Sequence, residues 1–141
     1  MRLIAALLWL SIGAVTHAGE LNRERALFNY QMFCQGCHTP DGSGANAVPQ
    51  MKGHVGYFMA TPLGREYLVR VPGSATSALD DEQLAEVLNW IILEFAGDRT
   101  GGDHEPYTAA EVRQLRQSPL NEVVTYRAHL LAEIATAKTR E

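Results

Sequence analysis

Two cysteines and a histidine stand at a spacing that supports covalent chemistry. Residues 34–38 read Cys-Gln-Gly-Cys-His, and Cys34 and Cys37 are the two cysteines of the 141-residue chain. Side chains three residues apart face the same side of a helical turn, so each thiol can bond one vinyl group of a porphyrin. His38 follows directly and offers an imidazole to the porphyrin iron. The pattern predicts one covalently attached haem c, with thioethers at Cys34 and Cys37 and with His38 as the proximal ligand.

Two other uses of these residues compete with haem attachment. A redox pair of the thioredoxin type lies in a β-α-β pattern, and no strand pattern precedes Cys34. Structural zinc takes four ligands, so a zinc site would need a distant residue such as His54, because the chain has no second Cys-x-x-Cys. The residues therefore favour haem attachment.

The first residues resemble an export signal. Arg2 precedes an uncharged apolar run over residues 3–15, and Thr16 and Ala18 place small residues at the −3 and −1 positions of a cleavage site. This arrangement predicts a signal peptide over residues 1–18 and an exported, periplasmic, soluble protein. An uncleaved anchor is the alternative, although a membrane span needs about 20 apolar residues.

The composition is that of a globular domain without a nucleic-acid partner. Hydrophobic residues make up 46% of the chain and charged residues 20%, with a formal net charge of −4. No basic run is present, and binding of phosphates requires clustered cations.

Helical periodicity dominates the sequence, which predicts an all-α fold. Residues 21–33 form an amphipathic pattern with Leu27, Tyr30 and Phe33 on its inner side,. A loop follows at 39–44, and a short helix at 64–71 is expected to stop at Pro72-Gly73,. The strongest helix is expected over 81–96, with Asp80 as its cap, Gly97 as its stop and an inward face of Leu84, Val87, Leu88, Ile91 and Phe95,.

Two more helices are predicted near the C-terminus. Thr108 and Glu111 form a capping-box pattern for the first, with Val112 and Leu115 inward,. The second is expected to start at Ser118-Pro119, with apolar positions Val123, Val124, Leu130, Leu131 and Ile134. We predict a haem-binding domain over 19–97 and a helical extension over 98–141, packed on or beside it. The extension has two alternative roles, stabilisation or the docking of a partner.

The order of these parts resembles a class I cytochrome c over residues 21–97. Val48-Pro-Gln-Met-Lys-Gly53 is similar to the family's Pro-x-Leu-x-Gly stretch. The resemblance implies that the Pro49 carbonyl accepts a hydrogen bond from His38 and so orients the imidazole without itself binding the iron. It also implies that Met51 packs on the haem.

The distal half of the resemblance contains a departure. Tyr67-Leu and Val-Pro-Gly-Ser-Ala-Thr76 resemble the family's distal stretch, in which a Met at the end supplies the second axial ligand. Thr76 stands at that position, so the usual ligand is lacking. The alternatives are Met59 as the distal iron ligand, an open or water-bound iron, or His54 or His104. Arg70, Trp90 and Tyr67 are either contacts to haem edges and propionates or ordinary packing residues.

What the resemblance implies is a one-electron carrier between a periplasmic dehydrogenase and a terminal acceptor, either an oxidase or a cupredoxin. The acidic balance favours partners with a basic patch. The alternative is a haem-based small-ligand binder or sensor with an open distal site. The sequence marks no acid–base pair for a peroxidase-like enzyme.

Overall fold

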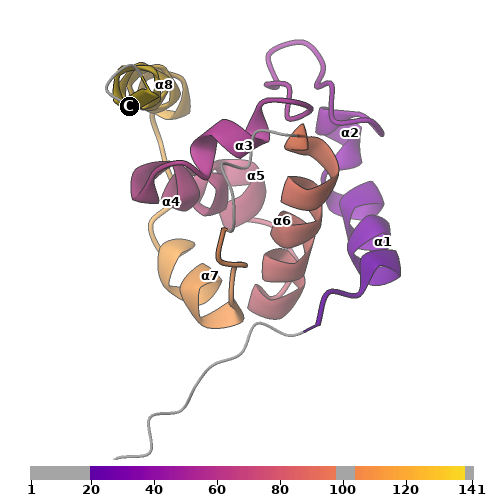
Figure 1. The fold of residues 1–141 in the computed structure, drawn as a ribbon. Coiled ribbons are helices and arrows are strands. Elements are labelled where there is room, and N and C mark those ends of the chain that lie inside the picture. The colour runs from indigo at the N-terminus through magenta and orange to yellow at the C-terminus, as the bar shows by residue number, and fades with distance from the viewer. Residues whose placement is uncertain (1–19, 98–103, 139–141) are drawn as a thin grey trace, which may run out of the picture.

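A computed structural model describes residues 20–97 and 104–138 of the chain. Over these residues the protein consists of helices and loops without a strand, which confirms the all-α, class I cytochrome c-like fold with two additional C-terminal helices (Figure 1). The predicted signal peptide lies outside the described residues. No helix among those described is long and apolar enough to cross a membrane. The helices are α1 Arg23–Phe33, α2 Gln35–His38, α3 Val55–Phe58, α4 Pro62–Arg70, α5 Pro72–Ala75, α6 Asp81–Phe95, α7 Ala109–Leu115 and α8 Val123–Lys138.

Helix α6 is the centre of the molecule, with α1 on one side and α7 on the other (Figure 1). Asp80 begins it with a complete capping box in which Gln83 reciprocates,. Gly97 follows the helix with φ +62, a conformation that glycine adopts without strain,. The predicted cap, stop and inward face are confirmed, and the buried apolar residues of α6 are Leu84, Ala85, Val87, Leu88, Trp90, Ile91, Ile92 and Phe95.

Helix α1 packs on α6 through Ala26 and Tyr30, which are both fully buried. The Tyr30 ring lies 5.1 Å from Trp90 and 5.5 Å from Phe95, centroid to centroid. The prediction that Leu27 faces inward is wrong, because the contact line runs through positions 26 and 30 and leaves Leu27 42% exposed. Phe33 is 47% exposed, although it borders the cavity described below.

Proline residues begin two of the helices. Thr61 caps α4, and Pro62 occupies its first turn, so α4 starts earlier than predicted. The predicted stop before Pro72-Gly73 is confirmed, because α4 ends at Arg70 with Val71 as its cap, but Pro72 also begins a second short helix, α5. Proline is tolerated at these positions because it lacks only an N–H that the first turn of a helix leaves unpaired anyway.

Helix α7 begins as predicted, but its capping box is only half formed. The Thr108 side chain accepts a hydrogen bond from the Glu111 N–H. The Glu111 carboxylate instead accepts two hydrogen bonds from Arg65 of α4, at 2.6 and 2.7 Å. Val112 is fully buried, and Leu115 is half-buried against the core. The pair Arg65–Glu111 therefore joins α7 to α4.

Helix α8 lies across α3 and α4 (Figure 1). It begins at Val123, so the prediction of a start at Ser118-Pro119 is wrong. The Ser118 carbonyl accepts a hydrogen bond from Arg70, and the Leu120 N–H donates to the Arg70 carbonyl at 2.9 Å. These bonds hold residues 118–120 along the end of α4, so α8 begins only after them, at Val123. Leu130 and Ile134 are buried as predicted, but Val124 is 85% exposed.

Candidate haem site

A cavity of about 360 Å³ opens between α2, α4, α6 and α8. Cofactor sites are concave and mostly apolar, roughly 300–1,000 Å³ in volume, and this one fits that description. Cys34, Cys37 and His38 border it together, which is the grouping that the sequence predicts. Most of the remaining wall is apolar and comes from α6 and from the chain around α3 to α5. Its apolar side chains are Phe33, Val48, Pro49, Met51, Val55, Phe58, Leu68, Val71, Leu84, Val87, Leu88, Ile91, Ile92 and Val123.

The single turn of α2 places the two thiols. The His38 N–H donates to the Cys34 carbonyl at 3.0 Å, and Cys34 itself ends α1 through its N–H bond to Tyr30. Both thiols are free; Cys34 is half-buried and Cys37 exposed. Burial, with a smaller contribution from Cys37, raises the pKa of Cys34 to about 11. Redox-active pairs have a lowered thiol pKa, so this environment is unlike theirs.

The imidazole of His38 is half-buried and lies near the Pro49 backbone. Burial lowers the pKa of His38, while the Pro49 backbone carbonyl acts in the opposite direction. The neutral imidazole is the form that ligates metals. Nδ1 is buried and makes no well-formed hydrogen bond, so the carbonyl is near the ring but not ideally aligned with it. A half-buried imidazole with a lowered pKa beside the Pro49 carbonyl fits a haem ligand.

Two glycines give the loop after His38 its shape. Gly42 and Gly44 have φ angles of +72 and +77. The Gly44 N–H donates to the His38 carbonyl at 3.1 Å, and a Cβ on Gly44 would lie 2.5 Å from the Val48 carbonyl oxygen. The close approach brings residues 48 and 49 back beside the imidazole. The loop therefore delivers Pro49 to His38.

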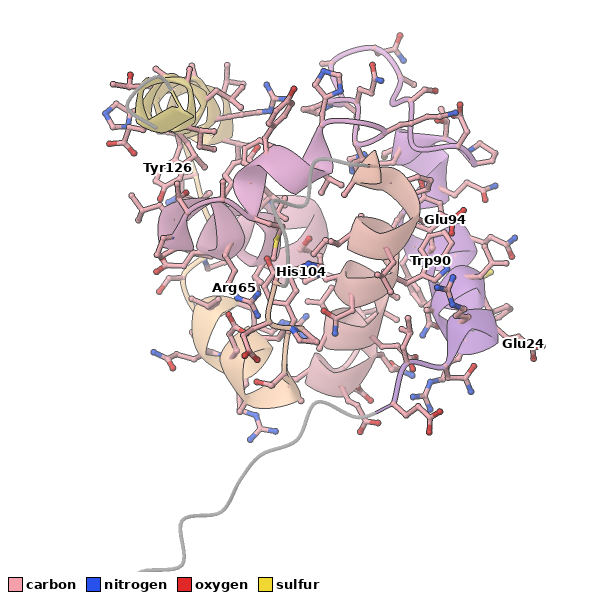
Figure 2. All side chains as sticks on the ribbon, viewed as in Figure 1. Glu24, Arg65, Trp90, Glu94, His104 and Tyr126 are labelled. Carbon is pink, nitrogen blue, oxygen red and sulfur yellow. The ribbon has the colours of Figure 1, made fainter. Side chains whose placement is uncertain are left out.

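The wall across the cavity from this loop comes from α4, α5 and α8. Tyr67 of α4 is 4% exposed, and its ring stacks on Phe58 with centroids 4.9 Å apart. Tyr126 of α8 also stacks on Tyr67, with centroids 6.0 Å apart, and Figure 2 shows it pointing from α8 toward α4. Arg127, the next residue, also borders the cavity. Burial raises the pKa of Tyr67, and the Arg127 charge partly opposes this.

Met59, one of the candidate distal ligands, does not border the cavity. Its sulfur lies 3.7 Å from the Tyr107 hydroxyl, which donates its proton to the Arg65 carbonyl at 2.7 Å, and its side chain packs against the core around α6. Thr76 is exposed, and its hydroxyl donates to the Pro72 carbonyl at 2.7 Å. The structure thus separates both residues from Cys34, Cys37 and His38.

The histidines considered as ligands also lie elsewhere. His54 is exposed, and its Nδ1 is 3.0 Å from the Lys52 carbonyl. His104 lies near Arg65 between α6 and α7 (Figure 2) and does not border the cavity. Within the part of the chain that is described, no group of three or more His, Cys, Asp or Glu side chains is arranged to hold a metal ion.

Of the three residues considered as haem contacts or packing groups, one borders the cavity. Tyr67 lies on its wall, whereas Trp90 packs between Tyr30 and Phe95 and Arg70 bonds to Ser118.

The sequence interpretation missed Tyr126 and Arg127. A signal was present, because Val123, Arg127, Leu130 and Ile134 follow the i, i+4, i+7, i+11 spacing of one helix face,. An arginine among three apolar positions indicates a cation facing an interior.

Comparison with known proteins gives the family. The chain is 34% identical over 106 residues to "Cytochrome c-552" of Thermus thermophilus, a match that covers 62% of this chain and 81% of that protein. The same identity over the same length, with 72% of the relative covered, is found for the "Cytochrome c-552" of a named strain of the same species. No protein-family model and no solved structure matches the chain.

Helical order, cavity and sequence similarity agree, and the chain belongs to the class I c-type cytochromes. It is an electron carrier that holds a covalently bound haem c. Redox proteins are its partners.

Proposed function

We propose that this cytochrome holds its haem through thioethers to Cys34 and Cys37, with His38 as the proximal ligand and Pro49 as the residue that orients His38. The observation that carries the proposal is the shared cavity: both thiols and the imidazole border one apolar space. The haem would supply the exchange of one electron between ferric and ferrous iron. The protein's part is to exclude water from most of the cofactor and to hold the imidazole neutral.

Cys37 gives this carrier a route to its partners. Its side chain is exposed, whereas Cys34 is half-buried, so the edge of a group attached at Cys37 reaches the surface. We propose that one electron enters from a periplasmic dehydrogenase and leaves to a terminal acceptor, an oxidase or a cupredoxin. The signal-like residues 1–18 and the net charge of −4 support an exported carrier that meets basic surfaces,.

Electron exchange with a basic partner tests this function. Reduced protein is mixed rapidly with an oxidised, basic cytochrome or cupredoxin, and haem oxidation is followed by absorbance. We expect fast oxidation that slows as salt rises, because screening weakens the attraction of opposite charges. A reduced protein that passes its electron to none of these acceptors would refute the carrier function.

We further propose that the distal methionine of the family is lacking. The contact of Met59 with Tyr107 and the exposed position of Thr76 support this. The sulfur and imidazole groups that border the cavity are Cys34, Cys37, His38 and Met51. Met51 belongs to the same loop segment as Pro49, and its N–H donates to Gly42 at 2.8 Å. The wall formed by α4, α5 and α8 contains no such group among the described residues.

This composition of the wall favours a second function, the binding of a small ligand at an open iron. Absorption spectra of the oxidised and reduced protein, before and after CO, separate the two functions. A low-spin spectrum unmoved by CO indicates a firmly held sixth ligand and leaves electron transfer alone. A high-spin spectrum that shifts with CO indicates an open position.

The segment 98–141 is proposed to complete the haem domain rather than to dock a partner. Tyr107 is 1% exposed, its backbone pairs with Asn89 at 2.7 and 3.0 Å, and its hydroxyl donates to the Arg65 carbonyl. Removal of residues 107–141 is therefore expected to abolish holoprotein. Intact holoprotein after that deletion would favour the docking role.

A further inference from the structure

One cation on the cavity wall lacks the partner that comparable arginines have. Arg25, Arg65 and Arg116 reach Glu86, Glu111 and Asp81 at 2.7, 2.6 and 3.1 Å. Arg127 is half-buried and borders the cavity, yet it forms no ion pair or hydrogen bond with any residue in the described part of the chain. Its neighbours are aromatic, with Cζ 5.7 Å from the Phe58 ring centroid.

The cavity wall that Arg127 borders offers no negative charge among the described residues. No Asp or Glu is among the described residues that border the cavity. Tyr67 is the titratable group of α4 that interacts with Arg127, whose positive charge acts to lower the Tyr67 pKa. The Tyr67 hydroxyl has no hydrogen-bond partner among the described residues. His38 faces the cavity from α2 and is held neutral by burial. The Arg127 guanidinium and the Tyr67 hydroxyl therefore both lie on the apolar cavity wall with hydrogen-bond donors that no described residue uses.

Such a wall is suited to an anion. A guanidinium near an apolar cavity loses hydration, and a partner that accepts its hydrogen bonds offsets that cost. Its planar fork matches a carboxylate or a similar small oxyanion. Stacking of Tyr126 on Tyr67 holds the α8 segment that bears Arg127 against α4, so this segment stands at the cavity wall without a ligand.

We propose that Arg127, with the Tyr67 hydroxyl, binds an anionic group in the haem cavity. The group is either a carboxylate of the haem itself or a small free anion, with nitrite and azide as probes of the second source. The inference rests on the proposed haem site and assigns a function to α8, which lies outside the segment that resembles the family.

The test uses full-length holoprotein with Arg127→Gln and Arg127→Lys, and with Arg113→Gln as the control. Arg113 of α7 is 71% exposed and bonded to Asp81, so its variant makes the same charge change away from the cavity. Three readouts are taken: azide and nitrite affinity of the ferric protein, CO affinity of the ferrous protein, and the reduction potential from pH 5 to 8.

If the source is a free anion, Arg127→Gln weakens azide and nitrite binding at least tenfold, as expected for the loss of a charged hydrogen bond. CO affinity, which involves no charge, changes less than threefold. The anion affinity of Arg127→Lys falls between those of wild type and Arg127→Gln.

If the source is a haem carboxylate, the reduction potential of Arg127→Gln falls below that of both wild type and Arg113→Gln, because an unpaired anion favours ferric iron. Its pH dependence steepens as well, because the released carboxylate titrates.

Equal anion affinities and equal potentials in Arg127→Gln and Arg113→Gln would overturn the proposal. The open-site function fails separately, through absence of any CO shift in the wild type. In that case the potential measurement still decides whether Arg127 pairs with a carboxylate.

Discussion

The rings of Tyr67 and Tyr126 lie parallel, 4° apart in tilt and 6.0 Å apart between centroids. This stack joins α4, which borders the cavity, to α8, which follows the segment that resembles a cytochrome. The same Tyr67 ring stacks on Phe58 at 4.9 Å. Helix α8 thereby packs against the wall of the haem site through the contact between Tyr126 and Tyr67.

Tyr126→Ala is expected to loosen this wall. The loss of an aromatic pair and of its buried area should lower the free energy of unfolding by about 1–3 kcal/mol. Chemical denaturation of the holoprotein measures the change. Val124→Ala is the control, because Val124 is two residues away and 85% exposed; it should lie within about 0.5 kcal/mol of wild type. Equal effects of the two variants would mean that α8 does not bind α4 through this stack.

Met59→Ala is expected to destabilise the protein without changing the iron's ligands. Met59 packs half-buried against the core and contacts the Tyr107 hydroxyl, so a loss of about 1–3 kcal/mol follows from the cavity left behind. The visible spectra of oxidised and reduced protein should match those of wild type. A change from low-spin to high-spin iron would instead show that Met59 is the sixth ligand.

Two glycine variants separate backbone crowding from simple side-chain addition. A Cβ on Gly64 would collide with the Phe58 carbonyl, whereas a Cβ on Gly36 meets nothing within 4 Å. Because a backbone atom cannot move aside cheaply, Gly64→Ala should cost about 3 kcal/mol or more and reduce the yield of holoprotein. Gly36→Ala, between the two cysteines, should express and bind haem normally. Comparable yields of the two would contradict the packing of α3 against α4.

Glu86 gives the stability a predictable acid dependence. Burial acts to raise its pKa, but hydrogen bonds from Arg25 and from the Asn22 N–H lower the pKa below the usual value. A carboxyl with a lowered folded pKa stabilises the protein above its unfolded pKa, about 4.3. That stabilisation is lost as pH falls through the folded pKa.

Glu86→Gln should therefore cost about 1–3 kcal/mol at pH 7, from the weakened hydrogen bonds, and progressively less as the pH falls below about 4.3. Thermal unfolding of both proteins over this range measures the difference. A cost that stays constant with pH would contradict the charge of Glu86 as its source.

Features set by neighbouring residues were predictable from the sequence, whereas features set by distant packing were not. Asp80, Gly97 and the Cys34–His38 turn depend on local geometry, and each appears where its pattern predicts. Leu27 and Val124 were misplaced because a helix's contact line depends on its partner's position. Pro119 did not begin a helix because Arg70, far along the chain, binds the backbone at Ser118 and Leu120. Arg127 reaches the cavity through the same long-range packing.

The most direct test of the account is the mass of the intact, denatured protein after export in cells that attach haem c. Wild-type chain is expected to carry one haem that denaturation does not remove, and the variant with both Cys34→Ala and Cys37→Ala is expected to carry none. His38→Ala should retain the mass of the attached haem. Its absorption spectrum should differ from that of wild type, because the iron has lost its imidazole ligand. Wild-type protein without covalent haem, or a double variant that retains it, would contradict the assignment of these residues.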